Sequence, residues 1–356
     1  MAAPEVTPDV TIVIPTYNRA HLLARAVASV QAQTHRAWEL VVVDDGSTDS
    51  TMADVTAMSI ADPRIRLIAN TGPHGPSGAR NAGLAKAQAD WIAFLDSDDT
   101  WEPQKLARFM AEASAHPDSV LIGSDYWMVD SERNRNETML AFVHREMIRW
   151  WQTEPLTVAI MPWRAIKADS QALAVPDVMR GMALGEFLWV HTSSAMIRLN
   201  AAKAAGGFDE SLTQTEDIDL WLNLADRGPV RFIAEPLAIF RIDGRDIGAG
   251  ERYASLSEQR RPNLYATKLA HLDLHFRMAR RYGCTTEQLP FLLSRLNHYH
   301  RICAQAALRG GSYWTYFAHR LACSRFGALA RLLAWLPPLR GRIPGPKIQM
   351  AWQGGR

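Results

Sequence analysis

The sequence predicts an α/β protein in which a mainly parallel sheet is flanked by helices and followed by a basic, helical C-terminal extension. Three observations predict this fold. Short β-branched runs alternate with helix-compatible segments through the first hundred residues, which is typical of parallel strands joined by crossover helices. The 356 residues, 47% of them hydrophobic, can bury a large core and still leave an appendage. The balance of charge changes sign near residue 250.

The expected strands and helices follow one another in a regular order. Each expected strand is a short apolar run that ends at polar residues. In the first part we expect strands and helices, in alternation, at Val10–Pro15, Leu22–Gln33, Leu40–Val43, Ser50–Ser59, Arg66–Ala69, Ser77–Ala87 and Trp91–Leu95. Further strands are expected at Val120–Ser124, Thr192–Ile197 and Val230–Phe240, with a helix at Thr215–Arg227. Residues 139–189, which are rich in Trp and Met, predict no regular structure.

Composition divides the chain into a first domain, residues 1–250, with halves 10–125 and 126–250, and an extension, residues 251–356. The first domain is acidic, whereas the extension carries 17 Lys and Arg against 4 Asp and Glu, with no acidic side chain after Glu287. Such an extension is typical of contact with something anionic, either phospholipid or nucleic acid. No motif that reads nucleic acid accompanies it, so nucleic acid is not an expected partner.

The setting expected for the chain is reducing and cytoplasmic. Its three cysteines, Cys284, Cys303 and Cys323, are an odd number and widely spaced, which fits neither a disulfide framework nor a zinc site. The first residues lack the basic start and apolar middle of a secretory signal. No apolar run approaches the ~20 residues that a membrane-spanning helix requires. We therefore expect a soluble protein, or one peripheral to the inner face of the plasma membrane.

Polar residues follow three of the expected strands and are candidates for a binding site, because ligands of open parallel sheets bind beyond the carboxyl ends of the strands. The three polar ends are Pro15-Thr16-Tyr17-Asn18, Asp44-Asp45-Gly46-Ser47 and Asp96-Ser97-Asp98-Asp99. Two aspartates one residue apart, Asp96 and Asp98, suit a ribose and a hard divalent cation that neutralises a diphosphate. An isolated pair of this kind is more often an acidic helix cap, and only its context favours a site.

Five motifs, in this order, resemble the family 2 inverting glycosyltransferases, which have the GT-A fold. They are Val13-Ile14-Pro15-Thr16-Tyr17-Asn18-Arg19, Val43-Asp44-Asp45-Gly46-Ser47-Thr48-Asp49, Gly78-Ala79-Arg80-Asn81-Ala82-Gly83, Asp96-Ser97-Asp98-Asp99 and Glu216-Asp217-Ile218-Asp219-Leu220-Trp221. The resemblance covers about Val10 to Asp246. It implies transfer of a sugar from a nucleotide diphosphate-sugar, expected to be a UDP-sugar, to a hydroxyl of a glycan, lipid-linked or protein acceptor. The process it implies is surface-polysaccharide or glycoconjugate biosynthesis.

The resemblance also assigns the donor site to residues 10–125. The residues that it places against the nucleotide-sugar are Pro15, Thr16, Tyr17, Asn18, Arg19, Asp44, Asp45, Arg80, Asp96 and Ser97. The first four line the nucleoside pocket, and either Asp44 or Asp45 reads the base. Arg80 holds the base or the diphosphate, and Asp96 faces the ribose. Asp98 binds the divalent cation, Mn²⁺ or Mg²⁺, while Asp99 supports it or caps the following helix.

A general base is expected at Asp217, oriented by Glu216, in the acceptor half formed by residues 126–250. Inversion at an anomeric carbon needs a base on the face opposite the departing diphosphate, and the resemblance implies that Asp217 is this base. The alternative is that both acids only favour the N-terminus of the helix that they begin. Asp219 is expected to be structural.

The chain departs from the family pattern at one metal ligand. Where many relatives end the last strand with an aromatic residue, a basic residue and a histidine that approaches the metal, this chain has Asp243. The Asp243 carboxylate can still bind a cation. His191 is a weaker candidate, because a histidine in such a position is more often a hydrogen-bonded pocket residue.

Two aromatic-rich segments leave alternatives open. Trp150, Trp151, Trp163 and Trp189 suit either stacking on an acceptor sugar or simple core packing. In the extension, apolar and basic side chains recur at helical spacing, namely Trp314, Phe317, Leu321, Ala328, Leu332 and Trp335, with Arg320, Arg325 and Arg331 among them. This pattern is typical of a helix that rests on anionic lipid, or of one that packs on its own domain.

Two other functions compete with sugar transfer. A non-catalytic carbohydrate- or lipid-binding module could retain the same fold, but the intact Asp98 and Asp217 favour an enzyme. A nucleotidyltransferase that makes activated sugars would need a Gly-rich phosphate loop with a basic residue early in the chain. The run Pro15-Thr16-Tyr17-Asn18-Arg19 does not provide one.

Overall fold

A computed structural model describes residues 7–130, 135–141, 171–173, 190–212 and 215–241, with scattered residues between 284 and 343. The chain divides into two compact units. The first comprises Met1–Arg149, Pro162–Met182 and Phe187–Pro262, and the second comprises Trp150–Met161, Ala183–Glu186 and Asn263–Arg356. The domain boundary predicted near Gly250 falls outside the described residues and stays a prediction.

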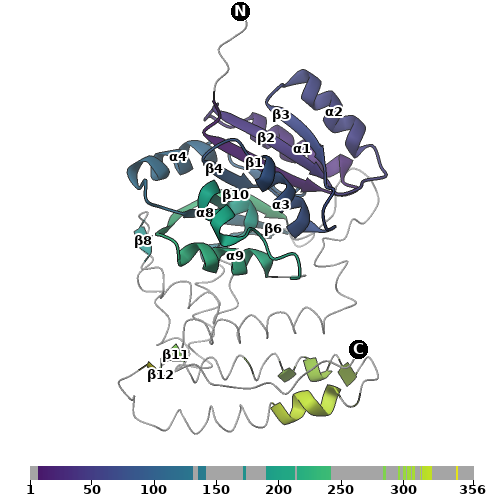
Figure 1. Ribbon diagram of the computed structural model, residues 1–356, viewed down its shortest axis with the longest axis vertical. Helices are drawn as coiled ribbons and strands as arrows, with labels where there is room; N and C mark the ends of the chain where they lie inside the picture. The colour runs from purple at the N-terminus through teal and green to yellow at the C-terminus, as the bar shows by residue number, and fades with distance from the viewer. Residues whose placement is uncertain are drawn as a thin grey trace, which may run out of the picture. The chain divides into compact units, whose positions relative to one another are not determined.

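The N-terminal half of the first unit is a parallel sheet with helical crossovers (Figure 1). Its strands are β1 (Val10–Thr16), β2 (Trp38–Asp44), β3 (Ile65–Ala69) and β4 (Trp91–Phe94), in the spatial order β3-β2-β1-β4. The helices that connect them are α1 (Ala20–Gln31), α2 (Thr51–Ala61) and α3 (Pro76–Lys86). β2 is buried along its whole length, and β1 along nearly all of it. The centres of the two strands, Ile12–Pro15 and Leu40–Val43, therefore read as continuous apolar runs rather than as alternating ones.

The second half of the same sheet is mixed. Its strands are β5 (Thr100–Trp101), β6 (Leu121–Asp130), β7 (Arg135–Thr138), β8 (Gln171–Leu173), β9 (Ala195–Arg198) and β10 (Val230–Arg241). β9 lies between β4 and β6 and runs antiparallel to both, whereas β10 is parallel to β6. The predicted strand Thr192–Ile197 is only partly right, because residues Thr192–Ser194 form a 3-10 turn, η2, before β9 begins.

Helix α9 (Glu216–Ala225) is fixed to the sheet by its aromatic side. Trp221 is fully buried, and its Nε1 donates a hydrogen bond to the backbone oxygen of Val190 at 3.0 Å. Phe208, which follows α8 (Leu199–Ala205), makes edge-on ring contacts with Trp221 and with Phe94 of β4. Packing of this kind holds the first turn of α9, with its three acidic residues, in a fixed position beside the end of β4.

The sheet and its helices confirm the α/β prediction. Helix α4 (Lys105–Ala115) follows β5 and precedes β6. In the second unit, β11 (Cys284–Thr285) pairs with β12 (Arg342–Ile343), and most of the described residues between 296 and 322 are helical. Within the part of the chain that the structure describes, no helix is both long enough and apolar enough to span a bilayer.

Candidate active site

The loops that follow β1 and β2 lie together, as the strand ends predicted. Asn18 has a left-handed backbone, with φ of 52°, and its backbone N–H donates to Ser47 Oγ at 2.9 Å. Its side-chain Oδ1 accepts hydrogen bonds from the backbone N–H of Thr48, at 2.7 Å, and of Asp49. Asparagine tolerates this backbone conformation better than most residues. Asn18 therefore ties the end of β1 to the turn after β2.

The two aspartates of that turn hold its shape. The Asp44 carboxylate is 4% exposed and accepts from the backbone N–H groups of Gly46 and Ser47. The Asp45 carboxylate accepts from the N–H of Gly75 at 2.7 Å and from the side chain of Asn70 at 2.6 Å. Asp45 thus joins the turn to the start of α3. Which of the two aspartates reads a base stays a prediction.

The remaining residues of the predicted nucleoside pocket differ in exposure. Thr16 is buried and Pro15 is half-buried, whereas Tyr17, directly after β1, is 56% exposed. Ser97, which the resemblance places against the nucleotide-sugar but not in this pocket, is buried in the turn after β4. An exposed aromatic ring is suited to stacking on a base, so Tyr17 is the member of this group whose surroundings best fit its predicted role.

Arg80 lies at the centre of the site, where its guanidinium bridges two carboxylates. Its side chain is 5% exposed, and it donates to Asp96 Oδ1 at 2.8 Å and to Glu216 Oε1 at 2.9 Å. Helix α3, which carries Arg80, packs closely on β1 at Gly83, because a Cβ at that position would lie 2.4 Å from Val13 Cγ1. The bridge links the end of β4 to the start of α9, although the residues it joins are 16 and 136 positions from Arg80. Contact of Arg80 with a base or diphosphate stays a prediction.

The bridge changes the charge states of its partners. Burial alone would raise the pKa of Asp96, but the positive charge of Arg80 opposes this effect and holds the pKa below its ordinary value. Burial would lower the pKa of Arg80, but the charges of Asp96 and Glu216 raise it. The guanidinium is therefore always charged, and Asp96 is ionised at neutral pH.

Asp217 stands in the first turn of α9 and is only 8% exposed. Its Oδ1 accepts from the backbone N–H of Ile218 at 2.8 Å, and Thr192 Oγ1 lies 3.4 Å from its Oδ2. Burial and then the negative charge of Glu216 raise the pKa of Asp217 to about 7, while Arg80 acts in the opposite direction. A carboxyl group with a pKa near the working pH can exchange a proton with a substrate hydroxyl.

The residue before this acidic pair has a strained backbone. Thr215 has φ of 65°, which is unfavourable for a β-branched residue. It immediately precedes Glu216, and strain of this kind persists only where the surrounding structure imposes it. The conformation of Thr215 thus fixes where α9 begins, and with it the positions of Glu216 and Asp217.

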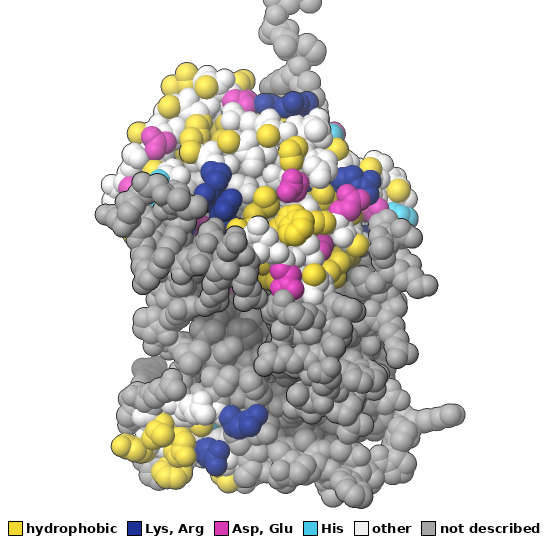
Figure 2. All heavy atoms as spheres, turned by 180° about the vertical axis from the view of Figure 1, so that it is seen from behind, with side chains coloured by type: hydrophobic (Ala, Val, Ile, Leu, Met, Phe, Trp, Pro, Cys, Tyr) yellow, Lys and Arg dark blue, Asp and Glu magenta, His cyan; other side chains and the backbone are white. Residues whose placement is uncertain are grey.

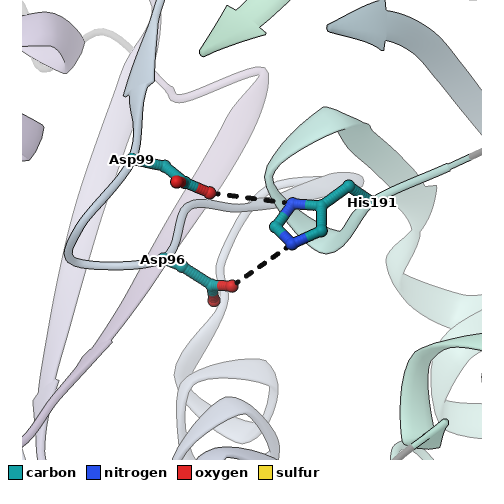
Figure 3. Close-up of side chains that lie close together, drawn as sticks. All are labelled: Asp96, Asp99 and His191. Carbon is teal, nitrogen blue, oxygen red and sulfur yellow. Dashed lines mark ion pairs between the residues drawn. The ribbon is translucent and has the colours of Figure 1, made fainter. Parts of the chain in front are cut away.

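His191 lies between two carboxylates (Figure 3). Its Nε2 is 3.9 Å from Asp96 Oδ2, and its Nδ1 is 3.7 Å from Asp99 Oδ2. Asp99 is 1% exposed and accepts a hydrogen bond from Ser193 Oγ at 2.6 Å, while the same Oγ accepts from the backbone N–H of Asp96. Sequence reasoning gave Ser193 no role, because nothing in its own motif predicts that η2 packs against the acidic turn.

The hydrogen bonds of His191 decide which of its nitrogens carries the proton. The backbone N–H of Ser193 donates to Nδ1 at 3.2 Å, so Nδ1 is the acceptor and the neutral ring carries its hydrogen on Nε2. Burial lowers the pKa of His191, which favours the neutral ring. As the ring is placed, its Nε2 faces Asp96 at 3.9 Å.

The acidic turn after β4 fits a divalent cation. One ligand atom from each of Asp96, Asp99 and His191 can be chosen so that all lie within 4.8 Å of one another, and oxygen ligands suit Mg²⁺ or Mn²⁺. Burial, followed by the charges of Asp98 and Asp96, raises the pKa of Asp99 well above its ordinary value. A cation bound here would offset this repulsion. Asp98 faces Arg19 in an ion pair, and Asp243 lies outside the described residues.

Comparisons with known proteins agree on one family. The family model described as "Glycosyl transferase family 2" matches residues 11–189. The succinoglycan biosynthesis protein ExoO of Rhizobium meliloti is 52% identical over 108 residues, which cover 30% of each chain. The Escherichia coli protein WfgD, a UDP-Glc:alpha-D-GlcNAc-diphosphoundecaprenol beta-1,3-glucosyltransferase, is 44% identical over 97 residues, or 27% of this chain and 38% of that one. The chain thus spans about a third of the length of these relatives.

Solved structures show the same fold at low sequence identity. The TarS 1–349 structure of S. aureus with UDP-GlcNAc is 16% identical, with a TM-score of 0.54 over 90% of this chain and 92% of that one. The mannosyltransferase PcManGT of Pyrobaculum calidifontis, in complex with GDP-Man and Mn²⁺, is 17% identical, with a TM-score of 0.51 over 93% and 85%. At these low identities, the two comparisons show the fold alone.

Proposed function

The chain belongs to glycosyl transferase family 2, and from this premise we propose that it moves one sugar from a nucleotide diphosphate-sugar to an acceptor hydroxyl with inversion. The fold is the predicted GT-A fold. The observation that carries the proposal is the bridge of Arg80 from Asp96, on the donor side, to Glu216, next to Asp217. Asp96 of the proposed donor site and Glu216, the neighbour of the candidate base Asp217, therefore contact the same buried guanidinium.

Asp217 is the proposed general base. With a pKa of about 7, it is partly ionised at neutral pH and can take the proton from the attacking hydroxyl. Glu216, held by Arg80, keeps the helix start in place and adds negative charge beside the base. Because the positive charge of Arg80 opposes the rise in the pKa of Asp217, it keeps this carboxyl ionised often enough to work.

The donor diphosphate is proposed to sit at the acidic turn. A Mn²⁺ or Mg²⁺ ion there would neutralise the diphosphate and so stabilise it as it leaves. Asp98 is the proposed metal ligand, with Asp99 behind it, and Arg19 would then pair with a phosphate oxygen in place of Asp98. His191 Nε2 faces Asp96 on this side of the site, at 3.9 Å from Oδ2, and Asp96 is the residue proposed to face the ribose.

The donor, acceptor and process are proposals guided by relatives. The names of relatives refer to succinoglycan and to a diphosphoundecaprenol acceptor used with UDP-Glc, so we propose a UDP-sugar, a lipid-linked glycan and surface-polysaccharide biosynthesis. A protein acceptor is the other candidate. We also propose that the reaction takes place at the cytoplasmic side of the plasma membrane. Against the competing function, a non-catalytic binding module, stands the position of Asp217, which is buried next to the Arg80 bridge and has a pKa raised to about 7.

Thermal-shift measurements test the donor site. UDP with Mn²⁺ should raise the melting temperature of the wild-type chain, because a ligand that binds only the native state stabilises it. UDP without Mn²⁺ should have a much smaller effect, and Asp98→Asn should abolish the Mn²⁺-dependent part. Comparison of UDP with GDP and other nucleoside diphosphates identifies the base.

The matched control is Asp118→Asn, an exposed aspartate in the loop after α4. This variant should respond to UDP and Mn²⁺ as the wild type does. If no nucleoside diphosphate changes the melting temperature, with or without Mn²⁺, the proposed donor site is wrong.

A further inference from the structure

Exposed large apolar side chains are concentrated in the few C-terminal residues that the structure describes. Seven large hydrophobic side chains are exposed among the residues that the structure describes, and four of them lie between positions 308 and 321. These four are Leu308, 44% exposed, Tyr313, 65%, Phe317, 60%, and Leu321, 56%. The much larger described part of the first unit exposes the other three, Tyr17, Met52 and Ile60.

Three of the four form a stripe on one side of a helix. Tyr313, Phe317 and Leu321 follow one another at intervals of four, and residue 313 and residues 315–322 are helical, so their side chains share a face. The opposite face turns inward, because His319 is 8% exposed and its Nδ1 lies 2.8 Å from the Nδ1 of His300. The helix therefore packs on its own unit through one side and leaves the apolar stripe on the other.

The same surface is positively charged. Arg320, adjacent to Leu321, is exposed, as is Arg301, and the sequence contains no acidic residue after Glu287 to offset them. Figure 2 shows apolar and basic side chains gathered next to one another on the described C-terminal residues. A partner for this surface needs both negative charge and an apolar layer.

We propose that Tyr313, Phe317, Leu321 and Arg320 form a docking surface for an anionic phospholipid bilayer. Interfacial helices bind such a membrane by burying apolar side chains at the boundary between head groups and acyl chains, while arginine side chains contact the lipid phosphates. A second copy of the chain fits less well, since it would bring two basic surfaces together. The proposal is based on the exposure and charge of these four side chains and does not require that the protein transfers a sugar.

The test is sedimentation of the full-length protein with vesicles, in the absence of nucleotide. The wild type should bind vesicles of phosphatidylglycerol and phosphatidylcholine, and bind pure phosphatidylcholine vesicles much more weakly. The double variant Phe317→Ser/Leu321→Ser should lose binding roughly tenfold or more, because each side chain gives up its burial in the bilayer. Arg320→Glu should weaken binding only to the anionic vesicles.

The chain offers a matched control in α2, which carries two exposed apolar residues of its own. Met52→Ser/Ile60→Ser removes a comparable apolar area, 42% and 83% exposed respectively, and should leave vesicle binding unchanged. Equal binding of the wild type to neutral and anionic vesicles would overturn the proposal, as would equal losses in both double variants. So would light scattering that finds a wild-type dimer dissociated by Phe317→Ser/Leu321→Ser, because the stripe would then be a dimer interface.

Discussion

Asp217→Asn is expected to lower the turnover number for sugar transfer by about 10²- to 10⁴-fold, the contribution typical of a positioned general base. The amide has the shape of the carboxylate but cannot accept the proton of the attacking hydroxyl. UDP with Mn²⁺ should raise the melting temperature of this variant as it does that of the wild type, since Asp217 is not a proposed donor ligand. The measurements are steady-state release of nucleoside diphosphate and the thermal shift.

The pH dependence separates catalysis from a structural effect. Since the pKa of Asp217 is raised to about 7, the base is protonated below that pH and ionised above it. kcat/KM should therefore rise with pH up to about 7 and then level off, and this rise should be absent in Asp217→Asn. Asp219→Asn, two residues further along the same helix, is the control and should retain the wild-type profile. A wild-type rate in Asp217→Asn would remove Asp217 from the mechanism.

Arg80→Met is expected to cost about 3 kcal/mol of folding stability, since removal of one partner of a buried ion pair leaves the other charge uncompensated. Here two carboxylates, on Asp96 and Glu216, lose the same counter-charge. Because Arg80 opposes the rise in the pKa of Asp217, the rise of kcat/KM with pH should also move to higher pH. Chemical denaturation and the pH–rate profile measure the two effects.

The conservative variant and a surface pair provide the controls for Arg80. Arg80→Lys keeps the charge but cannot contact both carboxylates with one planar group, so it should show a smaller loss of stability and a smaller shift of the profile. Arg108→Met removes an arginine whose ion pair with Glu235 is about half exposed, and it should cost about 1 kcal/mol or less. If Arg80→Met lowers stability but leaves the pH profile unchanged, Arg80 acts only as a structural residue.

The sequence was sufficient to predict the strands and helices that form the rim of the site. β2 and α1 are recognisable because burial on both faces makes the centre of β2, Leu40–Val43, continuously apolar, while α1 buries one regular stripe. The antiparallel placement of β9 between β4 and β6 was not predicted. It depends on pairing between segments far apart in the chain, and a four-residue strand carries no signal of its direction.

The composition of the site was predictable, but its internal contacts were not. The order of motifs indicated Arg80, Asp96, Glu216 and Asp217, yet no local pattern predicts that one guanidinium joins residues of α9 and the end of β4. Likewise, the proton on His191 Nε2 follows from the backbone N–H of Ser193, which only the 3-10 turn brings to the ring. Roles that depend on Asp243 or on Trp150, Trp151, Trp163 and Trp189 concern residues outside the described part of the chain.

The configuration of the sugar released from the donor tests the central claim most directly. With water as the acceptor, the proposed base at Asp217 delivers the attacking oxygen to the face opposite the diphosphate. Proton NMR recorded before the free sugar equilibrates should therefore show the β-anomer from an α-linked UDP-sugar, together with an equal amount of UDP. Release of the α-anomer, or no release from any nucleotide-sugar in the presence of Mn²⁺, would contradict the account.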